Sequence, residues 1–186
     1  MTRIAICIVI SIVSVRARAA EPTGAPVPGA PTEMVARAGA VEVGKPMPSF
    51  GGVDLDDGVI SLKRLLAAPA PKALLVSFFA TWCIPCREAL PVLKQAAARD
   101  GVRLLLIDVG EEADLVRPFL EERGLAKQSV LIDRFGEVSQ RIFAGETKLP
   151  RTFLIDGKGT TRAIFIREGA DLEAVLSREL AKVVQQ

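Results

Sequence analysis

Two cysteines separated by two residues are the part of this sequence best suited to covalent chemistry. Cys83 and Cys86 enclose Ile84 and Pro85, and Trp82 comes directly before them. A thiol with a lowered pKa is nucleophilic at neutral pH, and a second thiol one helical turn away can displace it from a mixed disulfide. The spacing therefore predicts thiol–disulfide exchange, with Cys83 as the nucleophile and Cys86 as the resolving thiol.

The segments on either side of the pair predict where it lies. Apolar runs at residues 73–79 and 102–109 are typical of parallel strands buried on both faces, and residues 84–99 between them have helical spacing. Cys83 then falls at the amino end of a helix, where unpaired N–H groups and the helix dipole stabilise a thiolate. Pro85 suits the first turn, because it has no N–H to leave unpaired.

The remaining sequence from Val41 onward predicts one α/β domain with a central mixed sheet and helices on both faces. Its further expected elements are helices at 111–123 and 137–143, a last helix with its apolar stripe over 172–184, a strand at 130–132, an antiparallel hairpin at 152–167, and an additional amino-terminal hairpin at 54–61 followed by a short helix at 61–68.

The composition excludes several other kinds of site. The 24 Lys and Arg against 22 Asp and Glu give a net charge of +2, which is no reason to expect nucleic-acid binding. Without histidine the chain has no Ser-His-Asp triad and no histidine-ligated metal, and three cysteines cannot form a four-thiolate zinc site. A purely structural disulfide is a weak alternative, since closing so short a loop stabilises a fold little. Two unreactive packed cysteines are the other alternative.

The amino end has the pattern of an export signal. After Arg3, an apolar run of about twelve residues extends over 4–15, which is short of the roughly 20 needed to span a bilayer. Ala17-Arg18-Ala19 supplies a cleavage pattern, so residues 1–19 are expected to be a signal peptide. A retained anchor at 4–15 is the alternative.

The segment after the signal predicts a spacer. Residues 20–40 are rich in Pro, Gly and Ala, which favours a flexible linker before a domain at 41–186. Cleavage after Ala19 would remove Cys7 and leave one cysteine pair.

Three stretches resemble the thioredoxin superfamily, and in particular its exported TlpA/ResA-like thiol–disulfide oxidoreductases. Residues 78–87 are similar to the active-site motif of that family, 149–156 to its cis-proline segment, and 44–50 to its entry segment. Pro91 stands where the family kinks its active-site helix. The resemblance covers nearly all of 41–186.

This resemblance implies a thioredoxin-like fold, no cofactor, and a cis bond between Leu149 and Pro150 that faces the dithiol. Taken alone, Pro150 reads as an ordinary trans proline at a strand entry. The substrate groove implied by the family is formed by Trp82, Ile84, Pro85, Leu149, Pro150 and Arg151.

Some residues depart from the family pattern. Ser77 replaces a buried aspartate that assists proton transfer in thioredoxins, and a serine is no general base at neutral pH. Glu88 is one residue short of the glutamate that many exported members carry, so we expect it to be a solvated helix charge. Arg151 with Lys148 is expected either to make the groove rim positive or to be a solvated surface arginine.

The sequence thus predicts an oxidoreductase of the bacterial periplasm or cell envelope. By resemblance, it would reduce or exchange disulfides of exported proteins and be reduced by a membrane thiol reductase; apocytochromes c (cytochrome c biogenesis), copper-site cysteines and misoxidised proteins are candidate clients. The direction of exchange is left open. One alternative is a Cu(I)-binding, copper-delivery protein that uses both thiolates. Another is a peroxide-reducing enzyme, although no peroxidatic threonine-cysteine motif is present.

Overall fold

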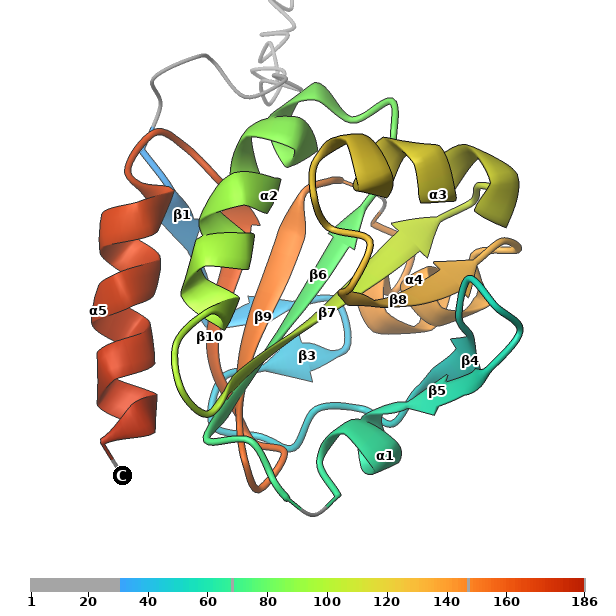
Figure 1. The fold of residues 1–186 in the computed structure, drawn as a ribbon. Coiled ribbons are helices and arrows are strands. Elements are labelled where there is room, and N and C mark those ends of the chain that lie inside the picture. Colours follow the sequence, from blue (N-terminus) through green and yellow to red (C-terminus); the bar gives the residue numbers. More distant parts are fainter. Residues whose placement is uncertain (1–30, 68, 147, 186) are drawn as a thin grey trace, which may run out of the picture.

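The computed structural model describes residues 31–67, 69–146 and 148–185 (Figure 1). The expected signal peptide, its cleavage pattern and Cys7 lie outside the described residues. No helix in the described part of the chain is both long and apolar enough to cross a membrane.

Ten strands and five helices make up the described chain. The strands are β1 (Glu33–Met34), β2 (Arg37–Ala38), β3 (Val41–Glu42), β4 (Gly51–Val53), β5 (Val59–Ser61), β6 (Ala73–Phe79), β7 (Val102–Val109), β8 (Ser129–Asp133), β9 (Arg151–Asp156) and β10 (Thr161–Arg167). The helices are α1 (Leu62–Leu65), α2 (Ile84–Ala97), α3 (Ala113–Glu122), α4 (Glu137–Phe143) and α5 (Leu172–Val184).

Eight of these strands form one mixed sheet in the order β1-β10-β9-β6-β7-β8-β4-β5. β6, β7 and β8 are parallel, whereas β9 pairs antiparallel with β6 and β10 with β9. The predicted mixed sheet, the antiparallel hairpin near the end and the additional hairpin β4–β5 are all confirmed. Parallel strands buried on both faces read as continuous apolar runs, which is why β6 and β7 could be located from sequence.

Helices cover both faces of the sheet and create two apolar cores. One core joins α2, α3 and α5 to β6 and β7, and both cysteines belong to it. The other joins α1, α4 and the β2–β3 pair to the opposite face. Figure 1 shows α2 and α5 side by side over the sheet, in agreement with their direct contacts. Successive residues of β6 therefore point alternately into the two cores.

The folded part begins earlier than residue 41. β1 pairs with β10, β2 pairs with β3, and Ala38 is buried, so the second half of the expected 20–40 linker is structured in its described residues. The strands β1, β2 and β3 are only two residues long. A strand this short has too few residues to show an alternation of apolar and polar side chains, so the sequence did not predict it.

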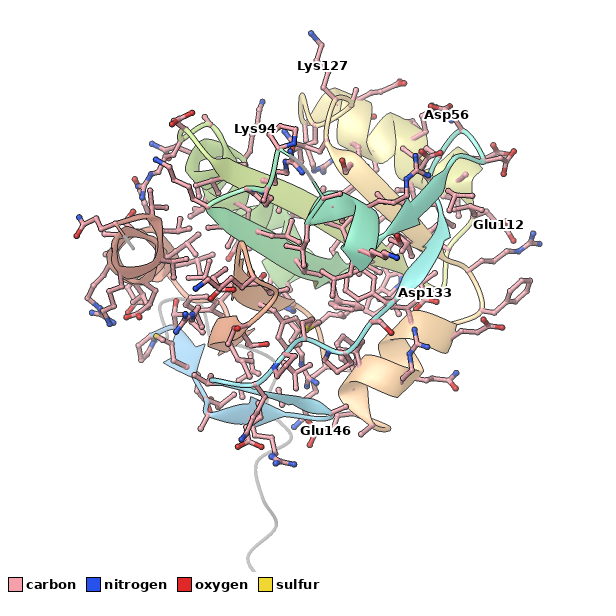
Figure 2. The ribbon with its side chains drawn as sticks, turned by 90° about the horizontal axis from the view of Figure 1, so that it is seen from below. Asp56, Lys94, Glu112, Lys127, Asp133 and Glu146 are labelled. Carbon is pink, nitrogen blue, oxygen red and sulfur yellow. A yellow bond between two sulfur atoms is a disulfide. The ribbon has the colours of Figure 1, made fainter. Side chains whose placement is uncertain are left out.

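Side chains at two helix starts differ in what they cap. The Asp133 carboxylate, labelled near α4 in Figure 2, accepts hydrogen bonds from the N–H groups of Val138 and Ser139 at 3.0 and 2.7 Å. Asp171 stands at the start of α5 but makes no cap bond there; its carboxylate accepts from the Thr32 N–H instead. Asp171 thereby joins the amino-terminal segment to the α5 end of the domain.

The α2 core should dominate stability. Leu93 on α2 is fully buried, and truncating it to alanine removes packed methyl groups and leaves a cavity, so L93A should cost about 2–5 kcal/mol of unfolding free energy. Leu115 on α3 is exposed, and L115A, which makes the same chemical change, should cost under about 0.5 kcal/mol. Urea unfolding of the oxidised protein, followed by circular dichroism, measures both; equal losses would contradict the assignment of the core.

Candidate active site

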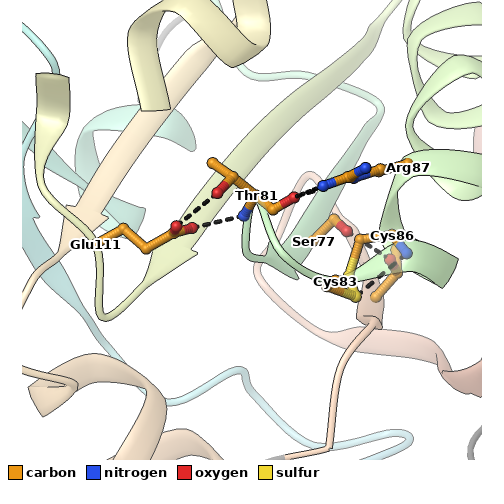
Figure 3. Close-up of a disulfide and its surroundings, with 7 residues drawn as sticks. Ser77, Thr81, Cys83, Cys86, Arg87 and Glu111 are labelled. Atoms are coloured by element: carbon orange, nitrogen blue, oxygen red, sulfur yellow. Dashed lines mark hydrogen bonds between the residues drawn. A yellow bond between two sulfur atoms is a disulfide. The ribbon is translucent and has the colours of Figure 1, made fainter. Parts of the chain in front are cut away.

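The loop between β6 and α2 carries the cysteine pair. Cys83 is the residue that caps α2, and its sulfur accepts a hydrogen bond from the Cys86 N–H at 3.2 Å. The two cysteines form a disulfide with their Cα atoms 5.3 Å apart (Figure 3). Pro85 lies in the first turn, as predicted. On reduction, the Cys83 sulfur would lie at the positive end of the helix dipole, which favours its thiolate.

The disulfide is nearly covered, while its neighbours are not. Cys83 is 4% exposed and Cys86 is buried, but Trp82 and Ile84 are 64% and 68% exposed. Large apolar side chains exposed beside a reactive group fit a contact surface for another molecule. Trp82 is therefore not part of the core.

The predicted cis peptide bond between Leu149 and Pro150 is present. It lies at the start of β9, and because β9 is antiparallel to β6, with Arg151 opposite Phe78, this start lies beside the end of β6 that leads to the cysteines. Pro150 is buried and Leu149 is half-buried. The sheet register thus brings two motifs separated by more than sixty residues to the same edge.

Arg151 is placed differently from both expectations. It is 2% exposed, and its partner Phe78 belongs to the core opposite the cysteines, so its side chain lies neither at the groove rim nor in solvent. Its guanidinium lies 4.4 Å from the centroid of the Phe143 ring and 3.1 Å from a carboxylate oxygen of Glu146, which is labelled in Figure 2. Burial lowers the pKa of Arg151, and Glu146 opposes that effect. Strand alternation is the physical reason, since one residue separates a groove-facing position from a far-facing one.

Two charged side chains hold the residue before the motif in place. The Glu111 carboxylate accepts hydrogen bonds from the Thr81 N–H at 2.5 Å and from its hydroxyl at 2.6 Å. Arg87 donates from Nε and Nη2 to the Thr81 carbonyl oxygen at 3.0 and 2.7 Å (Figure 3). All polar groups of Thr81 are thereby engaged, which fixes the path of the chain into Cys83.

Sequence reasoning did not single out Glu111 or Arg87 for this role. A usable signal existed for Glu111, because it follows the carboxyl end of β7, and the carboxyl ends of neighbouring parallel strands form the site edge in α/β sheets. Glu88 is exposed, in line with a solvated helix charge, and Ala89 beside it is buried.

A buried carboxyl group binds the backbone of Glu111. Asp108, at the end of β7, is fully buried and accepts a hydrogen bond from the Glu111 N–H at 3.1 Å. Burial, a side-chain contact with Glu111 and the repulsion between the two acids raise the pKa of Asp108 from its ordinary 3.8 to about 8. The protonated acid is thus the favoured form near neutral pH.

The fold and the redox pair define a protein of the thioredoxin-like class. The chain belongs to the AhpC/TSA family, whose model matches residues 43–164. It is 32% identical over 122 residues to the thiol-disulfide oxidoreductase ResA of Bacillus thuringiensis, and this match spans 64% of the chain and 66% of that relative.

Two further similarities agree with this class. The chain is 34% identical over 117 residues to the DsbE homolog, a thiol:disulfide interchange protein, of Paracoccus denitrificans, covering 63% of the chain and 62% of the relative. The crystal structure of a thiol:disulfide interchange protein of the thioredoxin family from Chlorobium tepidum superposes with a TM-score of 0.60 at 28% identity, over 78% of this chain and 99% of that one.

The raised pKa of Asp108 predicts a pH dependence of stability. Because the fold favours the neutral acid, this group stabilises fully at acid pH, and its contribution is lost as the pH rises from 3.8 toward about 8. D108N keeps an uncharged group of the same shape, so relative to wild type it should gain at least about 1.4 kcal/mol between acid and mildly alkaline pH.

Denaturant unfolding of both proteins at several pH values measures this gain. A constant difference between variant and wild type across the pH range would show that Asp108 titrates normally in the folded protein.

Proposed function

We propose that this protein is a thiol–disulfide oxidoreductase that exchanges electrons with protein disulfides through Cys83 and Cys86. The observation that carries the proposal is the cysteine pair at the amino end of α2, with Cys83 as the capping residue and the cis-proline segment beside it. The names of the relatives support the same class of activity.

In the reducing direction, the Cys83 thiolate attacks one sulfur of a substrate disulfide. A Cys83–substrate bond forms, and the other substrate sulfur leaves as a thiolate that takes up a proton. Cys86 then loses its proton and attacks the Cys83 sulfur, which releases the second substrate thiol. The substrate gains two electrons, and the protein is left with the disulfide seen in the structure.

The surface around the pair supports an extended polypeptide as the substrate. Trp82 and Ile84 offer exposed apolar contacts, and Leu149 lies at the neighbouring strand start. We expect the backbone before the proline at position 150 to pair with an incoming strand. Main-chain hydrogen bonds of this kind give affinity without demanding one substrate sequence.

The expected partners and location follow from the sequence pattern. A signal at 1–19 would export the domain to the periplasm or cell envelope, where its clients would be disulfide-bearing exported proteins. A membrane thiol reductase would restore the dithiol after each turnover. Membrane attachment would require that the apolar segment at 4–15 stays uncleaved.

Cu(I) delivery is the weaker alternative. Soft thiolate and thioether ligands suit Cu(I), but Met47 belongs to the core on the opposite face of the sheet, away from the cysteines. Among the described residues no group of three or more His, Cys, Asp or Glu is arranged to hold a metal ion.

Insulin reduction with dithiothreitol as electron donor tests the proposal. The wild type should accelerate precipitation of the insulin B chain, whereas C83S should fall to the uncatalysed rate because it lacks the attacking sulfur. C86S should still attack but not resolve, so it should accumulate a mixed disulfide that mass spectrometry detects.

The conservative variant of an exposed neighbour provides the control. E88Q leaves both sulfurs and the Thr81 contacts in place and should match the wild type. Equal rates for wild type and C83S would reject the exchange function, and tight stoichiometric Cu(I) binding by such an inactive protein would favour the copper alternative.

A further inference from the structure

A carboxyl group is buried at the end of β10 without an ionic partner. Glu168 is 5% exposed, and among the described residues neither of its carboxylate oxygens makes a hydrogen bond of good geometry. A buried polar group without a partner costs free energy, so it calls for an explanation. The exchange reaction described above does not use Glu168.

The polar group that acts on this carboxyl is the hydroxyl of Thr152. Burial raises the pKa of Glu168 from its ordinary 4.5 to about 7, while the contact with Thr152 partly opposes the rise. Thr152 already donates its proton to the Ser77 oxygen at 2.9 Å. A hydroxyl rotates about its C–O bond, so Thr152 can donate either to Ser77 or to the Glu168 carboxylate, and the second arrangement is the one that opposes the rise of the pKa.

Ser77 connects this pair to the cysteines. It lies on β6 between Leu75 and Phe79, both of which belong to the core that contains Cys83 and Cys86. By strand alternation its hydroxyl points toward the same side of the sheet, and Figure 3 draws it within the surroundings of the disulfide. Ser77 and Thr152 are both fully buried.

We propose that Glu168 stores the proton that Cys86 gives up and recovers during exchange, and that Thr152 and Ser77 carry this proton between them. The proposal rests on the exchange function proposed above. Glu168 does not touch the reacting sulfur atoms and acts on them only through the two hydroxyls. The cysteines remain the reacting groups.

The proton balance closes in both directions. When Cys86 attacks the mixed disulfide, its S–H proton passes to Ser77, the Ser77 proton to Thr152, and the Thr152 proton to the Glu168 carboxylate. The Cys86–Cys83 bond forms, the Cys83–substrate bond breaks, and the departing substrate sulfur takes a proton from solvent. When a donor thiolate reduces the disulfide, the chain runs backward and Glu168 protonates the Cys86 sulfur. A hydroxyl can serve in both directions because it donates and accepts at once.

Other acids are less suited to this task. Glu88 is exposed. Asp108 lies on the same side of the sheet and accepts from the Glu111 N–H through Oδ1; its Oδ2 has no hydrogen-bond partner in the part of the chain that the structure describes, and the Ser77 hydroxyl is bonded to Thr152 instead. Arg151 is on the opposite face, and no charged side chain contributes to the pKa shift of Glu168. Among the described residues, the polar side chain that acts on Glu168 is that of Thr152, whose hydroxyl is bonded to Ser77. With no histidine in the chain, a carboxyl whose pKa is near 7 is matched to proton transfer at neutral pH.

The resolving step can be observed separately from the first attack. Reduced protein mixed with dithiobis-nitrobenzoate releases one coloured thiolate when Cys83 attacks and a second when Cys86 resolves. In stopped-flow measurements, E168Q should keep the first phase and slow the second at neutral pH by at least about tenfold. The second phase of the wild type should rise to a plateau near the pKa of Glu168, whereas that of E168Q should keep rising with hydroxide concentration.

Two relay variants and one matched control complete the experiment. S77A and T152V remove one hydroxyl each and should reproduce the slow second phase, and the double variant E168Q/S77A should be no slower than E168Q, because one broken link already stops the chain. Glu179 is also buried, and it is bound by Arg178 and Lys182 on α5, so E179Q should leave both phases unchanged.

The outcomes separate the two proposals. A wild type without any first phase would reject the exchange function itself. A wild type with two phases, together with an E168Q second phase of unchanged rate and pH profile, would overturn the relay alone. If E168Q does not fold, S77A and T152V decide, and a normal second phase in both would also overturn the relay.

Discussion

The structure depends on the path of the chain between β6 and α2. A thiolate at the amino end of a helix is stabilised only if its sulfur stays beside the unpaired N–H groups. The contacts of Thr81, two residues before Cys83, fix the backbone that holds the sulfur there. Glu111 holds the N–H and hydroxyl of Thr81 from the end of β7, and Arg87 holds its carbonyl from α2. The loop is therefore tied to the strand beside it and to the helix that follows.

The loop that carries the cysteine pair lies close to two acidic side chains, whose charge would disfavour a negative sulfur. In the proposed reaction the reduced site carries a negative sulfur, and Asp108 and Glu111 lie close to the same strand ends. Burial keeps Asp108 neutral, so the site avoids a second buried negative charge beneath the loop. Glu111 can then remain an acceptor for Thr81 without placing two adjacent charges near the cysteine pair.

Much of the fold could be predicted because its signals are local. The apolar runs of β6 and β7, the helical spacing after Cys83 and the Gly157–Gly159 turn each lie within one continuous segment. The cysteine spacing and the proline at position 150 are likewise readable from short motifs. What the sequence reading missed depends on alternation across strands: Arg151 was expected near the groove and lies in the opposite core. The contacts of Glu111 with Thr81 join residues thirty positions apart, and no local pattern specifies them.

The burial of Arg151 has a consequence for how the groove can vary. Its guanidinium joins Phe143 and Glu146, which precede the cis-proline segment, to the strand that follows it. The base of this segment is thus fastened on the face of the sheet opposite the cysteines. Trp82 and Ile84 are exposed, so replacing them would leave that anchor intact. For the function proposed above, the support of the cis-proline segment and the exposed contact surface therefore come from different residues, so one can change without the other.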